Sequence, residues 1–147
     1  MTRGTPLSSE TIHASCVAID GVAVLIEGRS GAGKSDLALR LIDRGATLVS
    51  DDYTVLLRDK SELVARPPAN LAGRIEVRGI GILTMDHVED VPVRMIVAIT
   101  EAPPRMPAEG RLRTIAGVQL REIALPSLEP SAPVKVELAL RRRMTDR

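Results

Sequence analysis

Aromatic residues are nearly absent from this chain of 147 residues, which has one Tyr and neither Phe nor Trp. Single-stranded nucleic acid is usually held by bases stacking on aromatic rings. The formal net charge of +1 also offers no broad basic surface. Both observations argue against a nucleic-acid partner. Apolar residues make up 44% of the chain, so the core must be almost wholly aliphatic, and a chain of this length can bury one such core.

Cysteine and long apolar runs are scarce as well. The one cysteine, Cys16, excludes an internal disulfide and a cysteine metal cluster, and it suits a reducing cytosol. No apolar run approaches the roughly 20 residues that span a bilayer. The N-terminus also lacks the charged-then-apolar profile of a signal peptide. We therefore expect a cytoplasmic protein without a membrane partner, with a loose segment over residues 1–10 and a single domain over residues 11–147.

Turn signals and periodicity predict an α/β fold. Two apolar runs, residues 12–19 and 22–28, flank Asp20-Gly21, a pair typical of a hairpin turn. Farther on, Leu37, Ala38 and Leu41 share one face of a predicted helix that ends near Gly45. Further strands are predicted over residues 46–50, 53–58, 62–66, 71–83 and 93–99, an irregular insertion over 101–110, short strands up to 125, and a last helix over 132–144.

The turn between the hairpin and the first helix fits G-x-x-x-x-G-K-[ST] at every fixed position. Its residues are Gly28, Arg29, Ser30, Gly31, Ala32, Gly33, Lys34 and Ser35. The glycines let backbone N–H groups turn toward an anion, and the helix adds the positive end of its dipole. Lys34 would contact the β- and γ-phosphates, and the Ser35 hydroxyl would bind Mg²⁺. The flanking strand and helix favour a nucleoside triphosphate site over a chance glycine-rich turn.

Two adjacent carboxylates, Asp51 and Asp52, follow the next predicted strand. A parallel strand beside the P-loop strand would bring them to the phosphates, where ligands of open α/β sheets bind. One aspartate would then hold Mg²⁺ while the other accepts the proton of an attacking hydroxyl. A turn or a helix cap is the alternative, purely structural role of this aspartate pair.

The two histidines carry less information. His13 alone is more simply an ordinary strand histidine, and His87 lies in a polar stretch that favours the surface.

These motifs together resemble the catalytic domain of HPr kinase/phosphorylase, a bifunctional enzyme that acts on a seryl residue of the phosphocarrier HPr. The resemblance rests on "GRSGAGKS", "LALRLIDRGATLVSDD" and "IEVRGIGIL", in this order, within about residues 12–100. It implies a P-loop mixed β-sheet flanked by helices, related to phosphoenolpyruvate carboxykinase and assembled as a hexamer. It also implies an ATP- and Mg²⁺-dependent serine kinase of HPr or a homologue, and a reverse phosphorolysis by inorganic phosphate.

The resemblance implies roles for individual residues. Lys34 and the P-loop backbone would bind the nucleotide phosphates. Ser35 and Glu76 would bind Mg²⁺, with Glu76 lying in "EVRG". Asp51 and Asp52 would include the general base for the acceptor serine. In the phosphorylase direction, the same aspartate would protonate the departing serine.

His13 matches a histidine that contacts the transferred phosphate or inorganic phosphate in the family. Arg74 and Arg78 would either stay solvated or pair with phosphate.

The chain departs from the family in two respects. It begins just before the catalytic domain, without the usual N-terminal domain. Its "ALPSLEPSAPVKVELAL" also lacks the arginines of a family loop that reads approximately Pro-Val-Arg-Pro-Gly-Arg-Asn. The missing arginines bear on phosphorolysis more than on kinase activity, and Arg121 is a candidate substitute.

Two other functions stay open beside a kinase of the HPr type. The first is a small-molecule kinase on the same P-loop frame. The chain shows no long arginine-rich lid to close over a small substrate, which argues against it. The second is a nucleotide-binding regulator without catalysis, in which ATP orders a surface for a partner. The presence of every candidate catalytic residue argues against that function.

Overall fold

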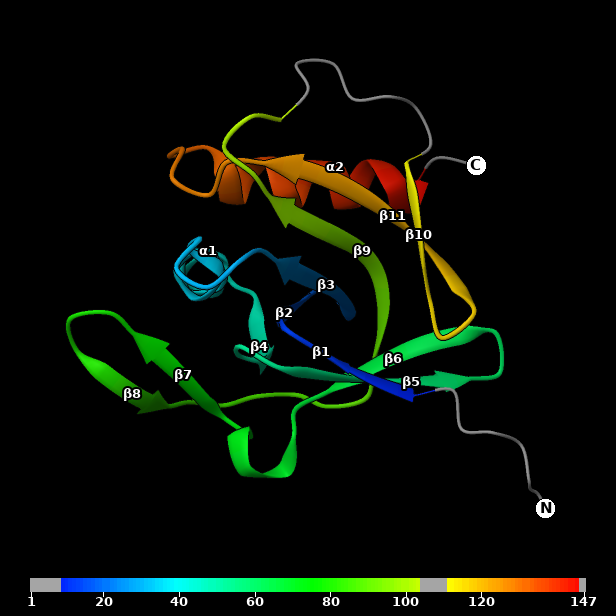
Figure 1. The fold of residues 1–147 in the computed structure, drawn as a ribbon, viewed down its shortest axis with the longest axis horizontal. Helices are drawn as coiled ribbons and strands as arrows, with labels where there is room; N and C mark the ends of the chain where they lie inside the picture. Colours follow the sequence, from blue (N-terminus) through cyan, green and yellow to red (C-terminus); the bar gives the residue numbers. More distant parts are fainter. Residues whose placement is uncertain (1–8, 104–110, 146–147) are drawn as a thin grey trace.

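The structure is a computed structural model that describes residues 9–103 and 111–145. Within these residues, a nine-stranded mixed sheet carries two α-helices, and a separate two-stranded hairpin projects from it (Figure 1). The strands are β1 (Ser9–Ile12), β2 (Ala14–Ile19), β3 (Val22–Glu27), β4 (Thr47–Ser50), β5 (Thr54–Asp59), β6 (Glu62–Arg66), β7 (Arg74–Val77), β8 (Gly81–Thr84), β9 (Val91–Ile99), β10 (Leu112–Ile115) and β11 (Val118–Leu125). The helices are α1 (Lys34–Asp43), α2 (Ala132–Thr145) and a short 3₁₀ helix over Ala69–Leu71.

The long strand β9 joins two halves of the sheet. Its first residues, Val91 and Pro92, pair antiparallel with β6, which leads on to β5 and β1. The rest of β9 pairs in parallel with β3 on one side and with β11 on the other. β9 therefore curves strongly (Figure 1), and the β1–β5–β6 half folds over one face of the β3–β9–β11 half.

The core lies on both faces of β3. Val24 and Ile26 contribute to a cluster with α1 and α2, while Ala23 and Leu25 contribute to a cluster under β5, β6 and β10. This alternation follows from the two-residue period of a strand. Because both faces are covered, β3 reads as a continuous apolar run. The aliphatic core predicted from the composition is confirmed. Cys16 is fully buried there, and its burial raises the pKa of the thiol.

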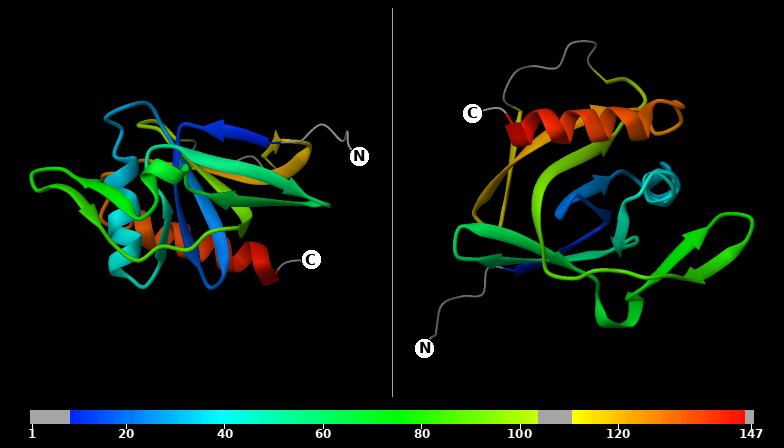
Figure 2. Two further views of the ribbon diagram at one scale, coloured as in Figure 1. Left: turned by 90° about the horizontal axis from the view of Figure 1, so that it is seen from below. Right: turned by 180° about the vertical axis from the view of Figure 1, so that it is seen from behind.

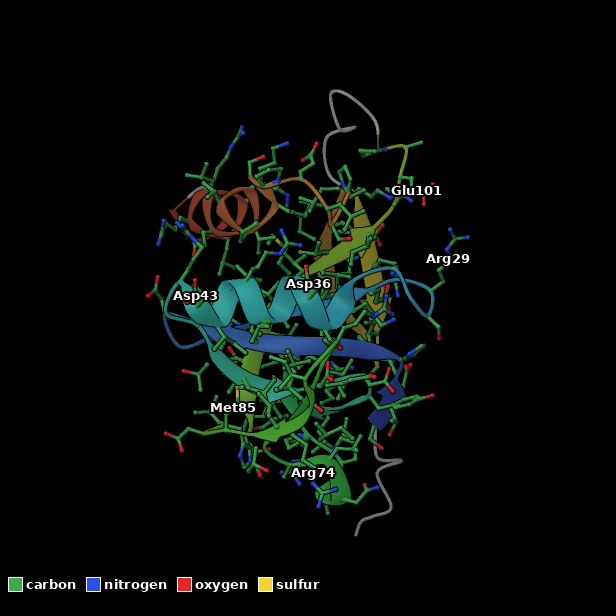
Figure 3. All side chains as sticks on the ribbon, turned by 90° about the vertical axis from the view of Figure 1, so that its left-hand side faces the viewer. Arg29, Asp36, Asp43, Arg74, Met85 and Glu101 are labelled. Carbon is green, nitrogen blue, oxygen red and sulfur yellow. The ribbon has the colours of Figure 1, made fainter. Side chains whose placement is uncertain are left out.

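The first helix forms as its sequence predicts. Leu37, Ala38 and Leu41 are fully buried against the sheet. Arg40 pairs with Asp36 one turn earlier, at 3.0 Å on the exposed side. The helix ends where Gly45 adopts φ +114°, a left-handed conformation that favours glycine. Figure 3 shows α1 lying across the sheet, with Asp36 and Asp43 on its outer side.

The "RIEVRGIGILT" segment forms the projecting hairpin of β7 and β8 (Figure 2). The predicted single strand, broken by glycine turns, is thus two short antiparallel strands. Gly79, in the turn between them, and Gly81, the first residue of β8, adopt φ of +88° and +126°. Ile75 anchors the hairpin in the helix-side core, whereas Ile80 and Ile82 are about 70% exposed.

Two expectations need correction. The strand that precedes the aspartates, β4, does not lie beside the P-loop strand, because β2 pairs antiparallel with both β3 and β4 and separates them. The loose segment predicted over residues 1–10 is also too long. Ser9 and Glu10 pair with β5, and the Glu10 carboxylate accepts the Ala116 N–H at 3.2 Å. Neither helix of the described part of the chain is long and apolar enough to cross a bilayer.

Candidate active site

The P-loop connects the end of β3 to the start of α1. Gly31 and Gly33 adopt φ of +83° and +100°, and the Ala32 N–H donates to the Arg29 carbonyl at 3.0 Å. Gly33 occupies the N-cap position of α1, and no side chain caps this end. The first N–H groups of the helix are therefore left for another acceptor. A phosphate fits this geometry, because it brings charge to the positive end of the helix dipole.

Lys34 is held beneath the loop. Its side chain is largely buried, and its ammonium donates to the carbonyls of Gly28 and Arg29 at 2.8 and 3.2 Å. A buried ammonium is stable only when its protons are paired with acceptors. The loop carbonyls serve that purpose, so the positive charge is fixed inside the turn that would surround the phosphates.

Asp51 lies directly against the P-loop. Its Oδ1 accepts the hydroxyl of Ser35 at 2.6 Å and that of Ser15 at 2.9 Å, and its Oδ2 accepts the Glu76 N–H at 3.0 Å. Four segments distant in the sequence meet at this one carboxylate. A hydroxyl and a carboxylate oxygen side by side are the hard oxygen ligands that Mg²⁺ prefers, so this pair fits a metal bound next to the phosphates.

Asp52 faces outward beside Asp51. Its backbone adopts φ +71°, and its Oδ1 lies 2.8 Å from Nε2 of His13. The side chains of Asp52 and His13 are 57% and 37% exposed. The sequence had indicated that His13 lies inside a strand. In the structure, His13 lies in a bend between β1 and β2. The bend lets its ring reach over the turn that carries the aspartates.

Glu76 approaches the site through its backbone. Its N–H binds Asp51, but its side chain is exposed on β7, next to the buried Ile75. Within residues 9–103 and 111–145, no three His, Cys, Asp or Glu side chains come close enough to enclose a metal. Mg²⁺ commonly takes one or two carboxylates and completes its shell with phosphate and water. The donor set here is of that open kind.

The loop after β11, singled out in the sequence for its missing arginines, packs on the P-loop, and this contact was not predicted. The Ser127 hydroxyl donates to the Ala32 carbonyl at 2.7 Å. Arg40 of α1 holds the same loop through the carbonyls of Ser127 and Glu129. A Cβ placed on Gly33 would come within 2.6 Å of Ser127 Oγ. The loop that lacks the family's arginines thus fixes the P-loop through a serine.

Arginines near the site pair with acids. Arg113 of β10 makes a two-pronged contact with Glu27, at 2.7 and 3.0 Å, immediately before the P-loop. Hydrogen bonding to Glu27 holds the pKa of Arg113 above its ordinary value. Arg29, at the tip of the P-loop, faces Glu101 beyond β9 at 3.6 Å (Figure 3). No sequence motif pointed to Arg113, because its partner lies 86 residues away in the chain.

Comparison with known proteins identifies the family of the chain. A family model described as HPr Serine kinase C-terminal domain matches residues 6–136 of the chain. The chain belongs to this family. The resemblance drawn from the P-loop, the acid pair and "IEVRGIGIL" is thereby confirmed.

Solved and curated relatives support the same family. A structure titled as the HPr(Ser) kinase/phosphatase from Coxiella burnetii superposes with a TM-score of 0.79 at 31% identity, covering 92% of this chain and 96% of that one. An HPr kinase/phosphorylase of Limosilactobacillus reuteri is 35% identical over 130 residues, and one of Clostridium beijerinckii is 30% identical over 133. These alignments cover 80% and 82% of this chain. The matched region spans only 41% and 44% of those two proteins. The mixed sheet with two helices is thus the fold of an HPr serine kinase C-terminal domain.

The structure brings together most of the residues proposed from the sequence of this HPr serine kinase C-terminal domain. Ser35 and Asp51 are in contact, and Asp52 and His13 are in contact beside them. Arg74 begins β7 and Arg78 follows it directly, while Arg121 lies opposite Leu112 in the β10–β11 ladder. The described contacts tie none of these three arginines to the acid pair. Figure 3 shows Arg74 near the bottom of the molecule and Arg29 beside Glu101 at the upper right. His87 is partly exposed and contacts Glu89, in keeping with the predicted surface role.

Proposed function

We propose that this domain transfers the γ-phosphoryl group of ATP to a seryl hydroxyl of the phosphocarrier HPr or a homologue. The contact between Ser35 and Asp51 carries the proposal, because it joins the phosphate-binding loop to the acid pair at 2.6 Å. Family membership supports the same reaction. The proposal concerns the domain, since the matched relatives are more than twice as long.

Nucleotide binding would be the work of the P-loop. The uncapped N–H groups at the start of α1 and the fixed ammonium of Lys34 would hold the phosphates. Ser35 and Asp51 would hold Mg²⁺. Glu76 contacts Asp51 through its backbone N–H, and a metal-binding role for its carboxylate rests on the family resemblance. When bound, Mg²⁺ neutralises charge on the β- and γ-phosphate oxygens.

Asp52 would accept the proton of the acceptor serine. A seryl hydroxyl is a weak nucleophile near neutral pH, so a neighbouring carboxylate must take its proton as the Oγ–P bond forms and the bond to ADP breaks. Asp52 has the exposure that a protein substrate requires, whereas Asp51 is buried and occupied by Ser35 and Ser15. His13 would steady the Asp52 carboxylate and lie where phosphate arrives.

The phosphorolytic direction draws less support. In that reaction inorganic phosphate attacks phosphoserine, pyrophosphate is formed, and Asp52 returns its proton to the serine oxygen. The loop that faces the P-loop carries Ser127 in this chain and no arginine. We therefore propose that kinase activity predominates. Assembly into a hexamer, which the resemblance implies, is a further part of the proposal and is testable by sedimentation.

The test is an assay of purified protein with HPr, Mg²⁺ and labelled ATP, followed by mass spectrometry of the phosphorylated serine. Asp52→Asn keeps the shape of the side chain and removes the base, so we expect transfer to fall by about 10²- to 10⁴-fold. The matched control is Asp20→Asn at the β2–β3 turn. Asp20 also has a positive φ, but it lies at the opposite end of β3 from the P-loop.

Other outcomes would select other functions. Labelling of a small metabolite but not of HPr would favour a small-molecule kinase. Tight ATP binding without any transfer would favour a regulator. Equal activity in Asp52→Asn and Asp20→Asn would contradict the role of Asp52 as base.

A further inference from the structure

The single tyrosine of the chain lies at the acid pair. Tyr53 follows Asp52 directly, and its ring stacks on the imidazole of His13 with ring centroids 4.9 Å apart and planes 23° from parallel. The Tyr53 residue is 44% exposed. The chain has no Phe or Trp, and its one Tyr lies at the surface against the histidine of the candidate site and not in the core.

The backbone turn fixes this placement. The Tyr53 N–H donates to the Asp51 carbonyl at 2.8 Å across Asp52, whose φ is +71°, which is the pattern of a γ-turn. The Ser50 hydroxyl donates to the Tyr53 carbonyl and closes the same turn. Side chains on both sides of the bend thus reach His13: Asp52 meets the ring edge at Nε2, and Tyr53 covers the ring face.

His13 needs such support. It lies in a bend between strands, with its side chain 37% exposed. One hydrogen bond from Nε2 to Asp52 leaves rotation of the ring about its bond to Cβ weakly restrained. An aromatic partner on the ring face limits that rotation, and stacked pairs contribute measurably to the preferred geometry.

We propose that Tyr53 is a positioning residue that holds the His13 imidazole with Nε2 toward the Asp52 carboxylate. The inference rests on the proposed function, in which Asp52 is the base and His13 steadies it. Tyr53 acts through the face of its ring, so a phenylalanine at this position would hold the His13 ring equally well. The hydroxyl is not required.

Proton NMR of the histidine rings tests the stack without any activity. The chain has two histidines, so His13→Gln identifies the His13 signals and His87 serves as the internal control. We expect the ring-current shift of the His13 C–H signals to persist in Tyr53→Phe and to vanish in Tyr53→Ala, while His87 stays unchanged. Unmoved His13 signals in Tyr53→Ala would overturn the proposal.

Kinetics with HPr then test the consequence. We expect Tyr53→Ala to lower kcat by about twofold to tenfold, the range of a stacked aromatic pair, at an unchanged KM for ATP, and Tyr53→Phe to restore it. In the His13→Gln background, Tyr53→Ala should add nothing further. An equal loss in that background would show that Tyr53 acts independently of His13 and would overturn the proposal. If wild-type protein transfers no phosphate to HPr, the proposed function fails, and the NMR result still decides the stack.

Discussion

At the scale of single residues, Ser15 links the two aspartates of the candidate site. It is fully buried in β2, donates its hydroxyl to Asp51 at 2.9 Å and accepts the Asp52 N–H at 3.1 Å. One side chain thereby holds the carboxylate of Asp51 and the backbone of Asp52. The sequence held a signal for this role, because Ser15 is a polar residue inside an apolar strand, and buried hydroxyls usually have partners. The sequence did not indicate which residues these partners are, because they lie 36 and 37 residues away.

Ser15→Ala tests this link. The substitution removes one donor from Asp51 and leaves the Asp52 N–H without its acceptor, so we expect the free energy of unfolding to fall by about 1–3 kcal/mol. Urea denaturation followed by circular dichroism measures the change. Ser61→Ala, an exposed serine between β5 and β6, is the matched control. Equal urea midpoints for the two variants would contradict the role of Ser15.

At the scale of elements, the P-loop and the strand before it are held by residues from the C-terminal half of the chain. The loop after β11 contacts it through Ser127, and Arg113 of β10 grips the strand that enters it. Within its own sequence, the P-loop is supported by the Lys34 ammonium and by the Ala32 N–H, which donates to the Arg29 carbonyl. Its shape therefore depends on tertiary contacts, which a motif cannot reveal.

Two glycine substitutions separate backbone strain from this contact. Gly31→Ala meets open space and carries only the cost of a positive φ, about 1–2 kcal/mol. Gly33→Ala carries the same cost and also presses on Ser127, which adds about 1–3 kcal/mol. We expect urea denaturation to rank Gly33→Ala as clearly less stable. Equal losses of unfolding free energy in the two variants would show that the Ser127 loop moves away from the added methyl group at no measurable cost.

Elements whose signals are local were predicted well. Asp20-Gly21 marked the β2–β3 hairpin, and the P-loop motif marked the start of α1. The strands predicted over residues 53–58 and 62–66 form β5 and β6. Strand order was not predictable in the same way. The expectation that β4 lies beside β3 was wrong because a hairpin places β2 in that position. The acid pair still reaches the P-loop, since β4 runs in the same direction as β3 two strands away.

At the scale of the whole molecule, two core clusters share the same central strands. β3 and β9 supply residues to the cluster under the helices and to the cluster under β5, β6 and β10. Neither cluster can lose its packing without exposing one face of these strands. The described part of the chain should therefore unfold as one cooperative unit.

Leu41→Ala and Leu56→Ala test that unity. Each residue is fully buried, the first in the helix-side cluster and the second in the other. We expect each substitution to lower the free energy of unfolding by about 2–5 kcal/mol and to preserve a single transition. Leu138→Ala, on the exposed face of α2, is the control. Two separate transitions in either core variant would show that the clusters unfold independently.

The placement of Tyr53 has a practical consequence. With no tryptophan in the chain, essentially all of its intrinsic ultraviolet emission originates from one phenol ring beside His13. Any event that alters the surroundings of that ring, such as the arrival of an acceptor protein that itself lacks fluorophores, would change the emission. The domain therefore carries its own optical reporter at the place where its chemistry is proposed to occur.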